Sequence, residues 1–371
     1  MKTVVKILLP VCIAILMYGC MNDDLLRDFN RLDENKKGEA VFIVNEGNFM
    51  YGNASLSYYN PADSAIINNV FYNTNALPLG DVAYSMTVND SLGYVVVNNS
   101  GKIYVINIHT FKYVGKITGL VSPRYISFVS DTKAYVTDLY AKSITVVNSA
   151  NLQVTGHISL DNGNQHFNQH STEQIVKYGG KVFVNCWSYD NKVLVIDINS
   201  DKVTDSITVA AQPNSMVLDK NGKLWVLSDG GSYGSPFGQE MAALTKIDAA
   251  TQNREKIFRF NDINASPTNL TINGSGDTLW FVYNGWDGTV VDGAGVFYMP
   301  VAAGELPRKP FIPQNGTLFY SLGIDPLNSD IYVSDAVDFV SPGKVYRFSA
   351  SGIAKDTLTV GIIPGDFCFV E

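Results

Sequence analysis

The chain has 371 residues, with 27 Lys and Arg against 35 Asp and Glu, which gives a formal net charge of −8. This acidic balance disfavours a nucleic-acid partner, because binding to phosphates needs clustered basic side chains. The length alone suggests two domains, whereas the repeat described below predicts one.

Residues 1–19 are predicted to be a lipoprotein signal peptide. Lys2 and Lys6 precede the apolar run 7–18, which is too short to span a membrane. A small residue comes directly before Cys20, as at the cleavage site of bacterial lipoproteins, so we expect Cys20 to carry a lipid. An ordinary signal peptide with an incidental cysteine is the alternative. Cleavage would remove two lysines and bring the net charge to about −10.

Residues 20–39 are expected to form the lipidated cysteine and a flexible tether, since their polar side chains leave little to bury. Asp23 and Asp24 follow Cys20 closely, which resembles the surface-export signal of lipoproteins in the Bacteroides group. We therefore expect a protein that is anchored in the outer membrane by its lipid alone and is exposed on the cell surface. Without that signal the protein would face the periplasm.

Residues 40–371 consist of short apolar runs separated by Asn, Asp, Gly and Pro, which predicts an all-β fold. Seven starting strands align at steps of 40 to 54 residues, and the equivalent positions are Met86, Ile126, Ile175, Met216, Leu270, Leu322 and Cys368. A second strand accompanies each of them. Four-stranded units of this length predict a seven-bladed β-propeller with four-stranded blades. A pair of β-sandwiches is the alternative, but it explains neither the sevenfold count nor the incomplete first unit.

The two ends of the repeat complete each other. The run 41–45 reads as a second strand without a starting strand, and the run 366–370 reads as a starting strand without a continuation. We therefore expect the C-terminal strand to complete the first blade, which leaves no open sheet edge. This register places Cys368 in the first blade and Cys186 in the fourth, so both are predicted to be free thiols.

One face of the propeller is the candidate ligand-binding face. In antiparallel blades, the loops after the second strands and the loops before the starting strands share a face. The candidates after the second strands are Asn45, Glu46, Asn48, Asn98, Asp138, Tyr140, Asn185, Trp187, Tyr189, Asp229, Tyr233, Tyr283, Asn284, Trp286 and Asp335. The candidates on the starting strands are Tyr84, Arg124, Asn214, Asn269, Tyr320 and Asp366. Interleaved amides, carboxylates and aromatics suit a bulky polar ligand or a protein surface, although Asn and Asp can also cap turns and aromatics can pack between blades.

Catalytic signals are weak. The spacing of His166, His170 and Glu173 would permit a metal site, but no helical pattern places the two rings on one side, so we expect no metal and no cofactor. The phosphate-loop motif and the complete calcium-loop motif are both absent. A lactonase-like hydrolase is the enzymatic alternative, and its best candidate carboxylates are Glu46, Asp138, Asp229 and Asp335.

The stretches FIVNEGNF at residues 42–49 and ASLSYYNP at residues 54–61 resemble the first blade of Bacteroides surface lipoproteins among the YncE-like propellers. That group includes BtuG-type lipoproteins, which capture cobalamin above an outer-membrane transporter. The resemblance implies a non-enzymatic protein that binds a corrinoid and passes it to a TonB-dependent transporter, with cobalamin as transported ligand. A propeller that recognises a glycan or a partner protein is the main rival.

Overall fold

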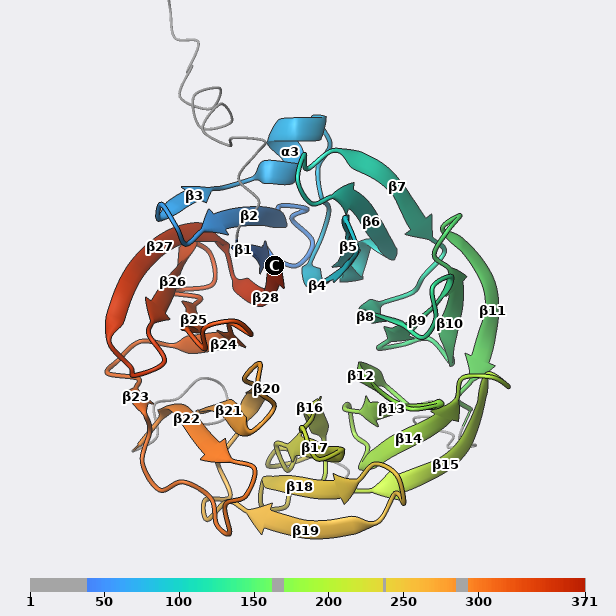
Figure 1. Ribbon diagram of the computed structural model, residues 1–371, viewed down its shortest axis with the longest axis vertical. Helices are drawn as coiled ribbons and strands as arrows, with labels where there is room; N and C mark the ends of the chain where they lie inside the picture. The colour runs from blue at the N-terminus through green and yellow to red at the C-terminus, as the bar shows by residue number, and fades with distance from the viewer. Residues whose placement is uncertain (1–38, 162–169, 236–237, 285–292, 371) are drawn as a thin grey trace, which may run out of the picture. The chain divides into compact units, whose positions relative to one another are not determined.

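The protein folds as a seven-bladed β-propeller, which confirms the predicted fold class. The structure is a computed structural model that describes residues 39–161, 170–235, 238–284 and 293–370. These residues form seven four-stranded antiparallel sheets, arranged as blades around a common centre (Figure 1). The predicted signal peptide and Cys20 lie outside the described residues, as do Trp286 and His166.

Each blade runs from an innermost strand outward. The innermost strands, in blade order, are β28 (Pro364–Val370), β4 (Ala83–Asn89), β8 (Pro123–Phe128), β12 (Thr172–Tyr178), β16 (Pro213–Leu218), β20 (Thr268–Ile272) and β24 (Phe319–Ile324). The second strands are β1 (Ala40–Asn45), β5 (Leu92–Val97), β9 (Lys133–Asp138), β13 (Lys181–Cys186), β17 (Lys223–Ser228), β21 (Thr278–Tyr283) and β25 (Ile331–Asp335).

The outer half of each blade holds two more strands. The third strands are β2 (Ser55–Asn60), β6 (Lys102–Asn107), β10 (Ser143–Asn148), β14 (Lys192–Asp197), β18 (Ala243–Asp248), β22 (Gly295–Pro300) and β26 (Pro342–Phe348). The fourth strands are β3 (Ala65–Ile67), β7 (Tyr113–Thr118), β11 (Gln153–Ser159), β15 (Lys202–Thr208), β19 (Arg254–Arg259), β23 (Ile312–Pro313) and β27 (Ala354–Ile362). In the part of the chain that the structure describes, the short helix α3 (Val70–Asn75) and the 3₁₀ turn η1 (Asn98–Ser100) lie in connections between strands. Within the described residues, no helix has the length and apolar character needed to cross a bilayer.

The ring closes through its C-terminal strand, as the repeat register predicts. β28 pairs antiparallel with β1, with Phe42 opposite Cys368, so the first blade combines the two ends of the described chain. Closure removes the exposed edge that an open array of blades would leave. Cys186 and Cys368 are buried free thiols in the fourth and first blades.

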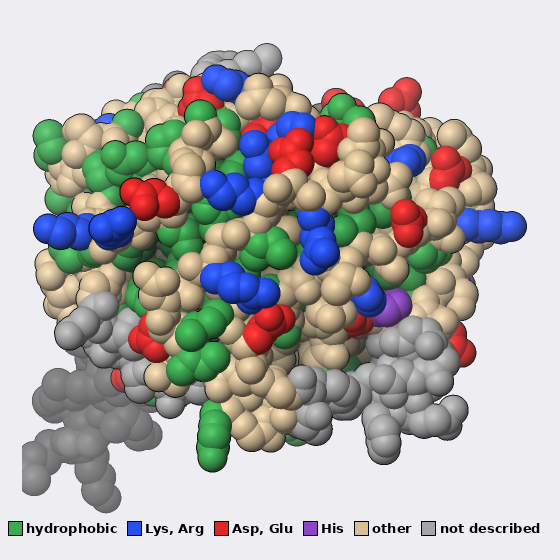
Figure 2. All heavy atoms as spheres, turned by 90° about the horizontal axis from the view of Figure 1, so that it is seen from below, with side chains coloured by type: hydrophobic (Ala, Val, Ile, Leu, Met, Phe, Trp, Pro, Cys, Tyr) green, Lys and Arg blue, Asp and Glu red, His purple; other side chains and the backbone are tan. Residues whose placement is uncertain are grey.

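The hydrophobic core lies between neighbouring blades. One cluster packs Phe183 and Val195 of the fourth blade against Met216 and Val226 of the fifth. The second strands pack on both faces of their sheet against apolar side chains of the neighbouring blades. All six residues of β1 are buried. Fourth strands face solvent, and in β15 only Ile207 is buried. On the side of the disc seen in Figure 2, basic and acidic side chains intermingle without an extended patch of one sign.

The connections define two faces. Loops that follow the second strands and loops that precede the innermost strands emerge on the same side because successive antiparallel strands alternate in direction. We call this side the upper face. The sequence candidates for ligand binding that fall within the described residues belong to these loops or to the strand ends that adjoin them.

Candidate functional site

A β-bulge near the upper end of every innermost strand shapes the site. The pairing between innermost and second strands shifts register once in each blade. The positions inside the shifts include Tyr84, Arg124, Glu173, Asn214, Asn269, Tyr320 and Gly365. A bulged residue leaves the regular ladder, and its side chain can be re-aimed. The bulges therefore place six polar side chains around the upper end of the ring's centre.

A buried ion pair lies at the heart of this arrangement. The Nε atom of Arg124 donates to both carboxylate oxygens of Glu173, at 2.8 and 2.9 Å. The two side chains are only 10% and 3% exposed, so the charges are compensated by each other rather than by water. The guanidinium also lies 3.4 Å from the ring centre of Tyr84 and donates to the Tyr84 hydroxyl. This contact fixes the orientation of the Arg124 fork.

The first blade adds two further carboxyl groups, of which Glu46 senses the charge of Arg124 and Asp366 that of Glu46. Glu46 follows β1 and accepts a 2.9 Å hydrogen bond from the Tyr320 hydroxyl, while Asp366 of β28 accepts one of 3.0 Å from the Met86 backbone N–H. Burial raises the pKa of Glu46 to about 7, opposed by the Tyr320 hydrogen bond and by the charge of Arg124. Burial also raises the pKa of Asp366 to about 7, and the neighbouring Glu46 charge adds to the shift. Both carboxyls can therefore gain or lose a proton near neutral pH.

We call the six residues Glu46, Tyr84, Arg124, Glu173, Tyr320 and Asp366 the central cluster. Electrostatic coupling links its members across the first, second, third, fourth and seventh blades. Tyr125 adjoins it, with its ring edge-on to Tyr84 at 5.5 Å between ring centres. The cluster offers hydroxyl donors, carboxylate acceptors and one guanidinium, so it can orient a polar ligand and can exchange protons with it.

Asp229 forms a second polar group on the upper face, beside Trp187. The indole N–H of Trp187 donates to Asp229 Oδ2 at 3.2 Å, and the Gly231 N–H donates to Oδ1 at 2.8 Å. Burial raises the pKa of Asp229 to about 6 against these hydrogen bonds. The Trp187 ring lies 5.9 Å from the Arg124 guanidinium, so this group adjoins the central cluster.

Most of the amide candidates are used inside the fold. Asn98, Asn185 and Asn284 each donate to a backbone carbonyl of the next blade's innermost strand, at Pro123, Pro213 and Phe319 respectively. Buried Asn45 donates to the Ser57 hydroxyl, Asn214 to the Pro267 carbonyl, and Asn269, at a φ of 58°, to the Tyr320 carbonyl. These hydrogen bonds connect strands and neighbouring blades. They support a structural role for these amides, the alternative to ligand binding.

Three other candidates also have partners within the fold. Asp138 accepts from the Ser122 and Ala141 N–H groups, and Asp335 accepts from the Val337 N–H, so both cap turns. Tyr283 stacks on Phe260 at 5.7 Å between ring centres. We assign these three a structural role as well. Asn48 donates to the Phe339 carbonyl and connects two upper-face loops.

Exposed apolar side chains gather on the upper face. The loops there carry a set that we call the apolar rim, and its members are Phe49, Met50, Tyr51, Tyr72, Leu77, Val121, Tyr140, Tyr189, Tyr233, Ile263, Val337, Phe339 and Val340. Tyr233 is 94% exposed and so packs on almost nothing within the chain. Among the described loops of the opposite face, the exposed large apolar side chains are Leu327 and Ile353. Such a one-sided concentration is typical of interaction surfaces, so this face is the candidate site.

The sequence spacing of His166, His170 and Glu173 does not bring His170 and Glu173 together in the structure. Glu173 turns to Arg124 and is 2% exposed, whereas His170 pairs through Nδ1 with the Asp190 carboxylate. Glu173 therefore lies apart from the His170 imidazole, because the bulge in β12 directs the Glu173 side chain toward Arg124. His166 lies outside the described residues.

Fold and site together define a seven-bladed β-propeller with a polar centre and an apolar rim on one face. The chain belongs to the family described as a domain of unknown function, DUF5074, whose family model matches residues 39–352. No curated protein matches the sequence significantly.

Several solved structures share the fold. A quinoprotein alcohol dehydrogenase-like protein from Bacteroides thetaiotaomicron is 15% identical over 89% of this chain and 78% of its own, with a TM-score of 0.66. The periplasmic gluconolactonase PpgL of Pseudomonas aeruginosa is 13% identical over 90% and 99%, with a TM-score of 0.65. Apo AztD from Citrobacter koseri is 11% identical over 90% and 97%, with a TM-score of 0.55. At these identities the likeness establishes the propeller fold alone.

Proposed function

We propose that this protein captures a bulky, amphipathic ligand on its upper face, and that the ligand is a corrinoid such as cobalamin. The observation that carries the proposal is the apolar rim, which surrounds a polar centre on one face only. A flat aromatic side chain buries apolar area at a small entropic cost, while hydroxyl and carboxyl groups fix orientation through hydrogen bonds. A corrinoid combines a large ring with peripheral amides and matches both parts.

The expected location adds to this proposal. A lipid on Cys20 would hold the propeller at the outer membrane, exposed on the cell surface and without other membrane contact. From there it would pass the ligand to a TonB-dependent outer-membrane transporter. The choice of a corrinoid follows from the resemblance of residues 42–49 and 54–61 to surface lipoproteins of a group in which some members capture cobalamin. Capture needs affinity rather than turnover, which agrees with the weak catalytic motifs.

Gel filtration with cyanocobalamin tests the proposal. After mixing with excess ligand, the purified protein should elute with one corrinoid per chain, read from the absorbance of the corrin ring. A double variant, Tyr140→Ala with Tyr233→Ala, removes exposed rim side chains and should elute with much less ligand. A matched change on the opposite face, Ile353→Ala, should retain it. Elution of the wild-type protein without ligand would contradict corrinoid capture and would leave a glycan or a partner protein as ligand.

Lactone hydrolysis is a second candidate, which the central carboxyl pair specifically favours. Glu46 or Asp366, with a pKa of about 7, could accept a proton from a water molecule that attacks a lactone carbonyl. A gluconolactonase is among the proteins that share the fold. Steady-state assays with gluconolactone decide between the candidates, since a hydrolase turns over many substrate molecules and loses activity in Glu46→Gln.

A further inference from the structure

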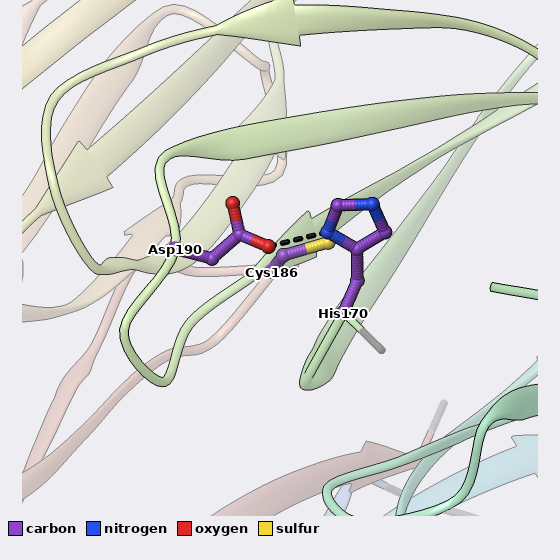
Figure 3. Close-up of side chains that lie close together, drawn as sticks. All are labelled: His170, Cys186 and Asp190. Carbon is purple, nitrogen blue, oxygen red and sulfur yellow. Dashed lines mark hydrogen bonds and ion pairs between the residues drawn. The ribbon is translucent and has the colours of Figure 1, made fainter. Parts of the chain in front are cut away.

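A group of three potential metal ligands lies in the fourth blade, apart from the central cluster. His170 precedes β12, Cys186 ends β13 and Asp190 lies in the following turn (Figure 3). Their donor atoms, one from each side chain, all lie within 4.8 Å of one another. Among the described residues this is the one group of three His, Cys, Asp or Glu side chains that converges so closely.

We propose that His170, Cys186 and Asp190 bind a zinc-class divalent ion and leave one coordination position open. Imidazole, thiolate and carboxylate are the ligand types that Zn²⁺ uses in proteins, at bond lengths of about 2.0–2.3 Å. A tetrahedral ion would separate the donor atoms by roughly 3.3–3.6 Å. The donor atoms already converge to within 4.8 Å, so small side-chain movements would bring them to this separation. The inference is independent of the proposed ligand on the upper face.

The ligand chemistry selects among metals. Mg²⁺ and Ca²⁺ prefer sites made only of oxygen ligands, and the thiol of Cys186 does not fit that set. Cu(I) prefers sulfur and nitrogen ligands, and the carboxylate of Asp190 does not suit it. A mixed set of nitrogen, sulfur and oxygen therefore points to a borderline divalent ion, of which Zn²⁺ is the main example.

The backbone around the group is held in place, so only side-chain rotation is needed for binding. Cys186 pairs with Thr172 in the sheet, and the Trp187 N–H donates to the Ser171 carbonyl at 2.8 Å. The Asp190 carbonyl accepts from the Gln212 N–H at 2.8 Å. An ion would replace the His170–Asp190 hydrogen bond by two metal–ligand bonds and would take the Cys186 sulfur as thiolate, with release of its proton to solvent.

Access is possible from the surface. The side chains of His170 and Asp190 are 16% and 14% exposed, whereas Cys186 is fully buried behind them. An ion would therefore arrive past the imidazole and the carboxylate and meet the sulfur last. Once bound, it would cross-link the end of β13 to the loop before β12. Such a cross-link stabilises the folded state, because the unfolded chain does not assemble the site.

Metal titration of the purified protein tests this site. We expect Zn²⁺ to bind with one ion per chain at the site and to raise the melting temperature, and we expect Co²⁺ to give a thiolate-to-metal charge-transfer band in the near ultraviolet. Cys186→Ser should abolish the band. His170→Ala and Cys186→Ser should each weaken Zn²⁺ binding by at least about 100-fold, since each removes a direct ligand.

Matched controls come from the same chain. Cys368→Ser changes the other buried free thiol, and His157→Ala changes an exposed histidine of the third blade. Both should bind Zn²⁺ like the wild type and, with Co²⁺, keep the band. His170 is partly exposed, so His170→Ala keeps the test decisive if the buried Cys186→Ser variant fails to fold. Wild-type protein without the Co²⁺ band, or equal Zn²⁺ affinity in His170→Ala, would overturn the proposal.

Discussion

Gly365 of β28 leaves the space that the Glu46 side chain fills: a Cβ atom at residue 365 would lie 2.4 Å from Glu46 Oε1 and 2.9 Å from Glu46 Cγ. The first blade thus differs from the other six, because its bulge carries no side chain and the polar group comes from the loop after β1. In the first blade, Glu46 from the loop after β1 therefore provides the polar side chain that a bulge residue provides in the other blades.

Gly365→Ala should displace Glu46 and break its hydrogen bond with Tyr320. We expect a loss of about 1–3 kcal/mol in the free energy of unfolding, because the added methyl group overlaps a side chain that is held in place. Gly304→Ala is the matched control, since a Cβ there meets nothing within 4 Å. Urea denaturation of both variants measures the difference, and equal stability would show that Glu46 moves aside freely.

Glu173→Gln should destabilise the protein by about 3 kcal/mol or more. It leaves the Arg124 guanidinium buried without a compensating charge, and such an uncompensated charge is costly. The exposed pair of Arg308 and Glu305, with side chains 83% and 76% exposed, provides the comparison. Glu305→Gln should change stability by less than about 1 kcal/mol, because solvent screens exposed pairs. Similar melting curves for the two variants would contradict a buried, dry ion pair.

Stability should fall as the pH rises from about 5 to about 8. The folded-state pKa of Glu46 and Asp366, about 7 for each, lies above the usual 4.5 and 3.8, so the folded protein holds protons that the unfolded chain has already lost. Each carboxyl contributes at most about 1.4 kcal/mol per pH unit within that window. Glu46→Gln should reduce the slope. Asp131→Asn changes an exposed residue on the opposite face and should leave the slope of stability against pH as in the wild type. A slope that is unaffected by Glu46→Gln would contradict the raised pKa of Glu46.

Tyr233→Ala and Trp187→Ala should separate binding from folding. Tyr233 is 94% exposed, so its truncation should leave stability within about 0.5 kcal/mol and weaken ligand binding. Trp187 also donates to Asp229, so Trp187→Ala should weaken binding and in addition lower stability by about 1–2 kcal/mol. Thermal melting and ligand titration of both variants check this. Unchanged affinity in both would place the ligand elsewhere.

The fold could be predicted from the sequence because its signal is repeated. Seven apolar positions from Met86 to Cys368 share one strand register, and the incomplete units at the two ends predict the pairing of β28 with β1. A repeat gives the same information seven times, so an uncertain strand in one blade is corrected by the others.

The site was only partly predictable. Glu173 stands two positions before Ile175, as Arg124 stands two before Ile126, so the same register could have assigned it to the centre. The role of Gly365 and the meeting of His170 with Asp190 could not be predicted, because both depend on local backbone shape. In the turn that contains Asp190, the preceding residue Tyr189 has a φ of 58°. No pattern in the sequence predicts this backbone conformation.

Isothermal titration of cyanocobalamin into the purified protein tests the central claim most directly, with thermal melting as a parallel readout. If the upper face captures a corrinoid, we expect one-to-one binding with a raised melting temperature, and weaker binding in the Tyr140→Ala, Tyr233→Ala double variant. Absence of heat and of any melting shift at micromolar ligand would contradict corrinoid capture.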